Sequence, residues 1–287
     1  MKSLLETIEE RRSGFSKGQR KLADYLKSNY EQAAFMTAYA LGEAVGVSES
    51  TVVRFAAGLG FSGYPDFKAA LRQLVMSSIT TVQRAKMAAA IPREDVVDAV
   101  LSVDIASIEN TKKLVDRDAF SAAADLILNA RRVYVLGLRA AMPLAQFLAY
   151  YLDFIRGDVL FVNGAVRDVK DGLSRLEAED LVIGVSFPRY DMRTIRAMGY
   201  AKAQGAAVVA ITDGDNSPAA ANASLALFAK TEMISFADSL CAPMSLINAL
   251  LVAVGLSRRD ETREHLEHLE RIWDEEGVFV KEAEGCV

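Results

Sequence analysis

The spacing of apolar residues divides the chain into a helical first part and a second part in which strands and helices alternate. Up to about residue 75, apolar side chains recur every three or four positions, as at Leu22, Ala23 and Leu26, which is the period of an amphipathic helix. Further along, five short runs are apolar at nearly every position, at 132–137, 159–162, 181–186, 207–212 and 225–229. Such runs are typical of parallel strands buried on both faces. The pattern predicts a multi-domain chain: an all-α domain, then an αβα sandwich with a five-stranded parallel sheet.

Residues 41–55 have the pattern of two short helices joined by a tight turn. Gly46 is suited to the turn, and Ser48 can cap the second helix. The apolar side chains expected to pack inward include Leu41, Val45, Val47, Val52, Val53 and Phe55. Those left to face outward are Glu49, Ser50, Thr51 and Arg54, which with Ser48 are the candidate DNA contacts. This is the arrangement of a helix-turn-helix, whose second helix enters the major groove of DNA. The alternative is an ordinary helical hairpin whose polar residues only cap a helix.

Other basic residues of the helical domain could contact the phosphates of a DNA operator. Lys17, Arg20 and Lys68 are the candidates for such contacts. Residues 1–75 contain ten Lys and Arg against eight Asp and Glu, although the whole chain has a net charge of −5. A mildly basic first domain on an acidic body fits a DNA-binding domain joined to a domain with another role.

The changes of pattern give the expected boundaries. We expect the helix-turn-helix domain at 1–76, a linker and connecting helix at 77–115, the sandwich at 116–257, and an amphipathic helix with a tail at 258–287. The helices of the sandwich are expected at about 140–155, 167–175, 190–204 and 239–256. The final helix has an apolar stripe that must pack against the sandwich, the DNA-binding domain or a second subunit. The stripe consists of Leu266, Leu269, Ile272 and Trp273.

Composition adds the class of protein. The 287 residues suit two domains, and 51% hydrophobic with 25% charged residues is ordinary for a soluble protein. We find no run of about 18 uncharged apolar residues and no apolar signal core near the start, so we expect a cytoplasmic protein with no membrane segment.

The histidines and cysteines offer little metal chemistry. His265 and His268 share one face of the final helix, where solvation is expected rather than a metal site. Cys241 is expected to be a small core residue, and Cys286 lies too far along the chain to form a metal-binding pair with it.

The expected ligand site lies beyond the carboxyl ends of the strands, as in other open parallel sheets. Two arginines follow strands there, Arg139 after the first and Arg189 after the third. A guanidinium can bind a carboxylate or a phosphate through two hydrogen bonds, and the amino ends of the following helices favour an anion. The candidate effector-binding residues are Arg139, Ala140, Ser186, Arg189, Tyr190, Thr212 and Asp213. The alternative is that both arginines are solvated or paired with Asp191 or Asp213.

The same region offers little for catalysis. The sequence contains no phosphate-binding loop with lysine, no nucleophile elbow and no dinucleotide-binding glycine motif. No histidine is expected near the strand ends, and only Asp213 and Glu232 could act as a base. We therefore expect no enzymatic activity, no cofactor and no metal. An isomerase-like enzyme that acts on sugar phosphates, with a helical accessory domain, is the alternative.

The run VGVSESTVVRFAAGLGFSGYPDFKAAL, with the helix expected at 16–28, resembles the N-terminal domain of the RpiR family of bacterial transcription regulators. The likeness covers about residues 3–76. Residues 120–256 look like the sugar isomerase (SIS) domain that follows in that family. The resemblance implies a homodimer or homotetramer that binds a palindromic double-stranded DNA operator and responds to a small effector, often a phosphorylated sugar.

The effector loops depart from the family pattern. Members that bind phosphosugars have serine-containing loops after the first and third strands, where this chain has GLRAA and SFPRYD. Of the serines in those loops, only Ser186 is carried over; Ser235 and Ser239 are retained from a later Ser/Thr-rich segment. The sequence predicts a regulator controlled by a small anion, which could be a sugar phosphate, a sugar acid or another carboxylate.

Overall fold

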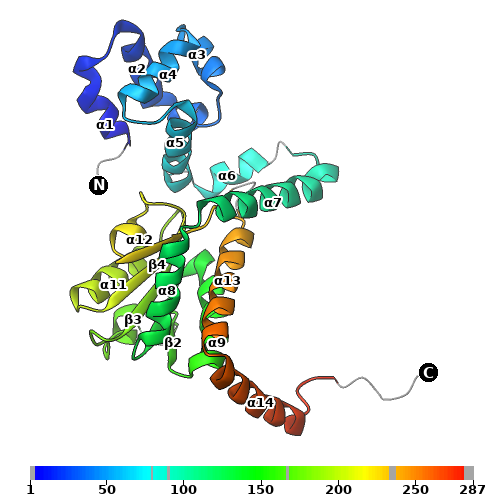
Figure 1. Ribbon diagram of the computed structural model, residues 1–287. Helices are drawn as coiled ribbons and strands as arrows, with labels where there is room; N and C mark the ends of the chain where they lie inside the picture. The colour runs from blue at the N-terminus through cyan, green and yellow to red at the C-terminus, as the bar shows by residue number, and fades with distance from the viewer. Residues whose placement is uncertain (1–3, 79, 89–90, 166–167, 233–236, 281–287) are drawn as a thin grey trace. The chain divides into compact units, whose positions relative to one another are not determined.

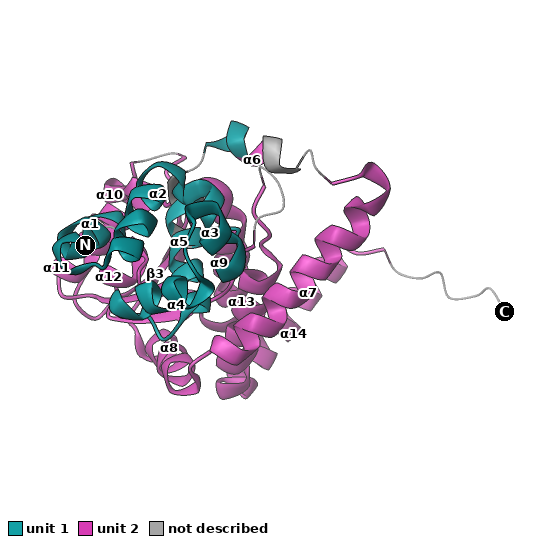
Figure 2. Cartoon of the chain, turned by 90° about the horizontal axis from the view of Figure 1, so that it is seen from above, with its two compact units in different colours: residues 1–83 teal, residues 84–287 magenta. Residues whose placement is uncertain are grey.

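The computed structural model describes the chain except for residues 1–3, 79, 89–90, 166–167, 233–236 and 281–287 (Figure 1). The chain separates into two compact units, residues 1–83 and 84–287, which Figure 2 colours differently. Unit 1 is helical, and unit 2 contains a parallel sheet. The boundary between them falls within one short helix, α6 (Thr81–Ala88).

Unit 1 is assembled from amphipathic helices around one apolar core. Its other helices are α1 (Leu4–Arg11), α2 (Lys17–Ala33), α3 (Ala38–Val45), α4 (Glu49–Gly58) and α5 (Tyr64–Ser78). A capping box starts α2: Ser16 Oγ accepts from the Gln19 N–H, and Gln19 Oε1 accepts from the Ser16 N–H. Phe55 is fully buried, with its ring 5.1 Å from that of Phe15 and 5.8 Å from that of Phe67.

Helices α3 and α4 form the expected helix-turn-helix. Gly46 ends α3 with a left-handed φ of 73°, and Ser48 Oγ accepts from the Thr51 N–H at the start of α4. The helices also touch at Gly42, where an added Cβ would lie only 2.8 Å from the Val47 carbonyl oxygen. A side chain at position 42 would therefore push the turn away from α3.

Unit 2 is the expected three-layer sandwich. Its sheet has the order β2-β1-β3-β4-β5, and all strand pairs are parallel. The strands are β1 (Val133–Leu136), β2 (Val159–Val162), β3 (Leu181–Val185), β4 (Ala207–Thr212) and β5 (Leu225–Phe228). All five strands coincide with the apolar runs of the sequence, because both faces of the sheet are covered.

Two sets of helices cover the two faces of the sheet. Val133 and Val135 pack with α8 (Arg117–Asn129), α9 (Met142–Arg156) and α13 (Cys241–Ser257). Tyr134 and Leu136 point to the other face, which packs with the second set. That set is α10 (Val169–Gly172), α11 (Met192–Ala203) and α12 (Pro218–Ala221).

Helix lengths in the sandwich differ from expectation most between β2 and β3. The helix predicted at 167–175 is only the four residues of α10. It ends at Gly172, a weak helix former whose Cα approaches the sheet so closely that an added Cβ would lie 2.8 Å from Val162 Cγ1. The helix predicted from residue 140 begins at Met142, because Arg139–Ala141 form a separate 3-10 turn, η3.

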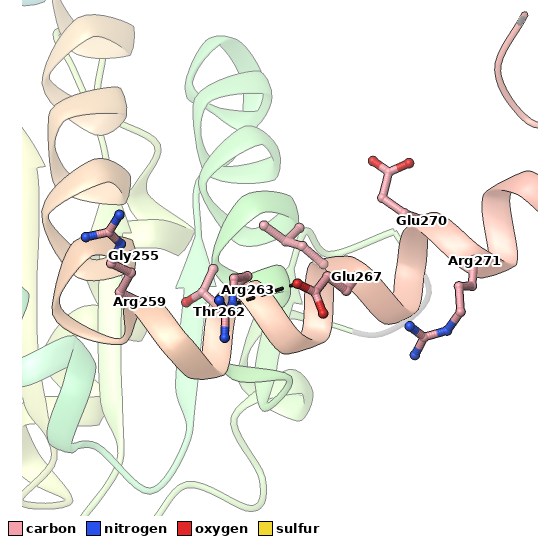
Figure 3. A pocket seen from close by; sticks show the side chains of 8 residues that line it. Gly255, Arg259, Thr262, Arg263, Glu267, Glu270 and Arg271 are labelled. Carbon is pink, nitrogen blue, oxygen red and sulfur yellow. Dashed lines mark ion pairs between the residues drawn. The ribbon is translucent and has the colours of Figure 1, made fainter.

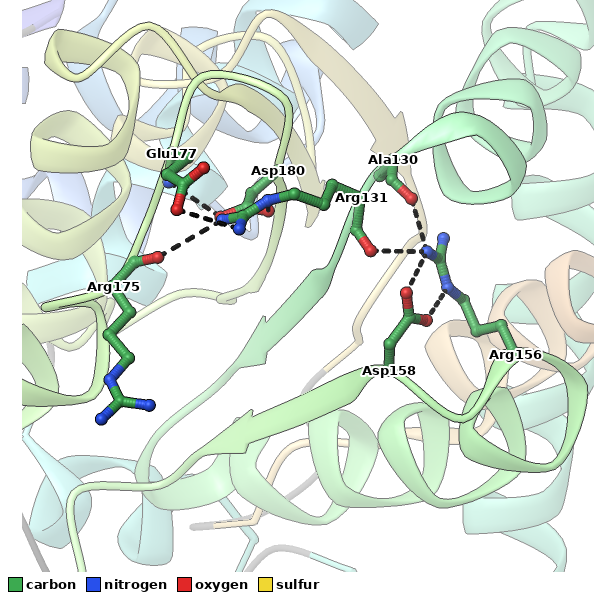
Figure 4. A network of polar contacts seen from close by, with 7 residues as sticks. All are labelled: Ala130, Arg131, Arg156, Asp158, Arg175, Glu177 and Asp180. Carbon is green, nitrogen blue, oxygen red and sulfur yellow. Dashed lines mark hydrogen bonds and ion pairs between the residues drawn. The ribbon is translucent and has the colours of Figure 1, made fainter.

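Ion pairs close the amino-terminal edge of the sheet (Figure 4). Arg131 donates to Asp180 through Nε at 2.9 Å and Nη2 at 2.8 Å, and Arg156 Nη2 donates to Asp158 at 2.9 Å. Because Asp180 is buried, its charge requires this bidentate partner. This charged network belongs to the framework and leaves the carboxyl edge of the strands as the region for ligand chemistry.

Two further helices flank the sandwich, α7 (Val96–Leu114) and α14 (Arg259–Glu276). The apolar stripe of α14 finds a partner in unit 2, since α14 packs on α9 and the Trp273 ring lies 6.0 Å from the Phe154 ring. Among the described helices, none alone has the length and apolar character of a membrane span. The pair α13 and α14 passes that test only when joined, and it is bent by 102°.

Candidate DNA-binding and effector sites

The polar residues predicted to read DNA gather on one face of α4. Ser48 Oγ lies 2.9 Å from both Ser50 Oγ and Thr51 Oγ1, and Arg54 Nη2 lies 3.4 Å from Thr51 Oγ1. Ser48, Glu49, Ser50 and Arg54 are exposed, whereas Val52, Phe55 and Ala56 are buried against the core. The amino end of α4 therefore presents a surface of hydroxyl, carboxylate and guanidinium groups.

One apolar residue of α4 joins this exposed surface. Val53 was expected to pack inward, but it is 40% exposed. It follows Val52, which occupies the buried face, and successive helical residues are rotated by about 100°. A valine among polar groups on a recognition helix could contact a thymine methyl group, which is an apolar feature of the major groove.

The three lysine and arginine candidates for phosphate contact lie on two other helices. Lys17 is exposed at the start of α2, next to Gly18, where an added Cβ would lie 3.1 Å from Thr51 Cγ2. It therefore lies beside the start of α4. Arg20 Nε donates to Phe15 O at 2.9 Å, and Lys68 Nζ donates to Phe35 O at 3.3 Å.

In unit 2, the loop after β1 is forced close to its neighbours. An added Cβ at Gly137 would lie 2.8 Å from Ala145 Cβ and 3.3 Å from the Val185 carbonyl oxygen. Only glycine fits between α9 and the end of β3 at this point. The close passage of the loop brings Arg139 and the exposed Ala140 to the carboxyl edge of the sheet.

Arg139 and Arg189 share an uncommon backbone conformation. Their φ angles are 55° and 63°, and in the described part of the chain no other residue except glycine has a positive φ. Both side chains are exposed, and they follow the neighbouring strands β1 and β3. Non-glycine residues in this region cost about 1–3 kcal/mol each and cluster at ligand-binding sites. Sequence patterns gave the positions of the two arginines but not this conformation.

The amino ends of α9 and α11 differ in their availability to an anion. Asp191 caps α11, where its Oδ1 accepts from the Arg193 N–H at 2.9 Å and its Oδ2 pairs with Arg193 Nη2 at 2.9 Å. The hydrogen bond from the Arg193 side chain lowers the pKa of Asp191, so the cap stays ionised. At the start of α9, Ala141 provides no side-chain cap. The expectation that both helix ends serve an anion is therefore restricted to α9.

Tyr190 and Thr212 are engaged with a carboxylate of the same site. Tyr190 Oη donates to Asp213 Oδ1 at 2.8 Å, and Thr212 Oγ1 donates to the same oxygen at 3.1 Å. Asp213 and Thr212 are buried at the end of β4. Lys230 Nζ lies 3.5 Å from the Asp213 carbonyl oxygen. Lys230 was not among the candidates, although its place directly after β5 was a sequence signal of the same kind as that of the arginines.

The serine candidates are divided. Ser186 is buried directly after β3, where its N–H donates to the Ile211 carbonyl at 3.1 Å. Ser239 Oγ donates to Asp104 on α7. Ser235 lies outside the described residues. The structure thus brings Tyr190, Thr212, Asp213 and the missed Lys230 into contact at one edge of the sheet.

The remaining hollow, the two histidines and Cys241 lie on α13 and α14 rather than in the loops at the carboxyl ends of the strands. An open hollow of about 600 Å³ runs along α14, lined by Gly255, Arg259, Thr262, Arg263, Leu266, Glu267, Glu270 and Arg271 (Figure 3). His265 and His268 are exposed on that helix, and no group of metal ligands is found among the described residues. Cys241 is exposed rather than part of the core, and a hydrogen bond to Asp104 raises the pKa of its thiol. The thiol is therefore less reactive than an ordinary one.

Comparison with known proteins supports the division into two units. Residues 2–78 match the model of the helix-turn-helix domain of the rpiR family, and residues 126–253 match that of the SIS domain. The chain therefore has the two domains of the RpiR family of transcriptional regulators. Its members bind DNA through the helix-turn-helix domain, so the chain is a DNA-binding regulator rather than an enzyme.

Individual relatives agree with this assignment. The transcriptional regulator HexR of Pseudomonas aeruginosa is 29% identical over 94% of this chain and 95% of its own. The sugar isomerase domain of an RpiR transcription factor from Sphaerobacter thermophilus superposes with a TM-score of 0.60 at 26% identity, over 62% of this chain and 99% of that one. Vibrio vulnificus NanR, solved with ManNAc-6P, gives 0.58 at 24% identity over 94% and 98%.

Proposed function

We propose that this RpiR-family regulator changes its affinity for DNA when a small anionic metabolite binds at the carboxyl edge of the sheet in unit 2. The metabolite is a sugar phosphate, a sugar acid or another carboxylate. The observation that carries the proposal is the pair of exposed arginines with positive φ, on the loops after β1 and β3. Strained backbone in two equivalent loops is retained more readily for ligand binding than for stability, because it lowers stability.

Three features support an anion at this edge. Arg139 and Arg189 offer charge and bidentate donors. The start of α9 has no side-chain cap, and Lys230 adds a third positive charge at the end of β5. The relative NanR is named with a phosphorylated amino sugar. The loops that carry serines in the family contain Arg139 and Arg189 here, which favours a carboxylate as well as a phosphate, since a guanidinium matches both geometries.

The test is a titration of the full chain with glucose 6-phosphate, gluconate and 6-phosphogluconate, which carry a phosphate, a carboxylate and both. Binding to the folded state raises the melting temperature, and we expect the largest rise with 6-phosphogluconate because it can engage both arginines. If none of the three compounds raises the melting temperature at concentrations up to about 10 mM, these classes of effector are ruled out.

We further propose that Ser48, Glu49, Ser50, Thr51 and Arg54 contact the operator in the major groove, with Lys17, Arg20 and Lys68 on phosphates. Two recognition helices of a homo-oligomer would lie about 34 Å apart and read a palindrome.

A second chain is also favoured by α7, on which the usual placement of polar and apolar side chains is reversed. Its two buried side chains, Ser107 and Thr111, are polar, whereas several of its apolar side chains face outward.

The outer face of α7 is suited to pack against the same helix of a second copy. Val97, Leu101 and Ile105 are 65%, 55% and 60% exposed along one stripe. In an antiparallel pair of α7 helices this stripe would pack on itself, and the acidic start of each helix would face the basic end, Lys112 and Lys113, of its partner. Self-complementary surfaces of this kind make closed two-fold dimers.

Charged residues in the α7 stripe should dissociate the oligomer. Leu101→Glu with Ile105→Glu places two carboxylates where two copies would meet, so we expect the mass by light scattering to fall to that of one chain of 31.2 kDa. Val252→Glu is the matched control, because Val252 is equally apolar and 58% exposed on α13. An oligomer that survives the α7 changes but not the control would place the interface on α13.

A further inference from the structure

A buried charge lies on the helix that joins the two units. Arg84 belongs to α6, and its side chain is 1% exposed. Its Nη1 lies 2.6 Å from Asp238 Oδ1, in the segment between β5 and α13. Arginine is almost never fully buried unless it is paired, because desolvation of its charge is costly. The Arg84–Asp238 contact, here called the linker ion pair, therefore fixes α6 to unit 2.

The segment that carries Asp238 is held at several points within unit 2. The Ser239 N–H donates to the Glu232 carbonyl at 3.4 Å, which brings the two ends of the stretch between them together. Ser239 Oγ and Cys241 Sγ both donate to Asp104 of α7, and the Lys230 N–H donates to Thr111 of α7 at 2.8 Å. Polar contacts thus tie the β5–α13 connection to α6 and to α7.

The same connection begins in the proposed effector site. Lys230 contributes its backbone N–H to α7 and its side chain to the Asp213 carbonyl. Asp213 in turn accepts the hydroxyl of Tyr190. Contacts therefore lead from the loop after β3, through Asp213 and Lys230, to Glu232. From there they continue through the Glu232–Ser239 hydrogen bond to Asp238 and Arg84. An anion that attracts Lys230 or displaces Tyr190 acts on one end of this chain of contacts.

We propose that the linker ion pair couples the effector site to the DNA-binding unit: it holds α6 in one of two states, and effector binding at the carboxyl edge biases the choice. The inference rests on the proposed function. Because α6 is the covalent path to the helix-turn-helix, its attachment to unit 2 limits the separations that two recognition helices of an oligomer can adopt. A buried pair is suited to such a role, because separating the buried guanidinium from the Asp238 carboxylate is costly and disfavours intermediate arrangements.

Hydrogen exchange of the full chain tests the attachment without any ligand or operator. In Asp238→Asn we expect the amides of residues 85–88 to exchange at least about tenfold faster than in the wild type, while those of β1 and β3 keep their protection. Arg263→Gln is the control, because it removes an exposed ion pair with Glu267 on α14, remote in sequence from α6. Wild-type protection of α6 in Asp238→Asn would overturn the proposal.

Operator binding in the presence of 6-phosphogluconate tests the coupling. We expect the wild type to change its operator affinity by a factor between about 5 and 150, and Asp238→Asn to reduce this factor below about two. An undiminished factor in Asp238→Asn would mean that the ion pair is only structural. If the wild type responds to none of the three anions, the proposed function fails. The hydrogen-exchange measurement still tests whether the linker ion pair attaches α6 to unit 2.

Two more variants guard against loss of folding. Arg84→Lys keeps a charge at the position and is expected to retain most of the protection of α6. The exchanged pair, Arg84→Asp with Asp238→Arg, should recover protection and coupling that either single change loses. The exchanged pair is informative only if unit 2 keeps its wild-type melting transition. In such a protein, failure to recover the protection of α6 or the effect of the anion on operator affinity would contradict the inference.

Discussion

Replacing Arg139 and Arg189 together by glycine should abolish the response to the anionic effector while leaving the protein as stable as the wild type or more so. Each arginine supplies a charge-assisted hydrogen bond worth about 1.5–3 kcal/mol, so the pair accounts for about a hundredfold or more in the dissociation constant. The stability follows from φ, which glycine adopts at 55° and 63° without steric cost.

The alanine version separates conformation from charge. Arg139→Ala with Arg189→Ala should lose the same ligand affinity but keep the left-handed strain, and so be about 1–2 kcal/mol less stable than the glycine version. Arg196→Ala is the control, since Arg196 is an exposed arginine within α11. Calorimetric titration with 6-phosphogluconate, together with thermal melting, measures both effects. Wild-type affinity in the glycine variant would place the effector elsewhere.

Gly42→Ala should destabilise the helix-turn-helix, displace its turn and thereby weaken operator binding. The new Cβ would lie 2.8 Å from the Val47 carbonyl oxygen and 3.4 Å from the Glu49 nitrogen. Both are backbone atoms of the turn, which cannot rotate away as a side chain can. We expect a loss of about 2–3 kcal/mol in unit 1, the upper range for overpacking. A separate calorimetric transition of unit 1, shifted down while that of unit 2 is unchanged, is the measurement.

Two control variants in α4 make the result specific. Gly58→Ala adds the same methyl group where the nearest atom, Gln19 Nε2, is 3.8 Å away, so stability should be equal or about 0.5–1 kcal/mol higher. Arg54→Ala should leave the melting temperature unchanged and weaken operator binding by about tenfold. If Gly42→Ala binds the operator as the wild type does, the close contact between α3 and the turn does not limit the fold.

The fold was readable from the sequence because its signals are local. Runs of apolar residues located all five strands, and Ser48 marked the start of α4. The sequence did not predict helix lengths or side-chain directions where close packing between distant residues determines them. The helix before β3 stops after four residues because Gly172 packs on Val162, and Val53 faces outward next to a buried Val52.

The site was readable only in outline. Arginines after β1 and β3 could be located by the rule for parallel sheets, but their positive φ is set by the tertiary fold. The hydrogen bond of Tyr190 to Asp213 joins residues 23 positions apart, and the linker ion pair joins residues 154 positions apart. No periodicity reports such pairs, because they depend on side-chain placement after folding.

The burial of Arg84 affects how the regulator should respond to ionic strength. Contacts between a protein and DNA phosphates weaken steeply as salt rises, because bound counterions are released on binding. A guanidinium that is 1% exposed is scarcely screened by the same ions. Ionic strength should therefore set how much of the protein occupies its operator, while the ratio of affinities with and without the effector stays nearly constant.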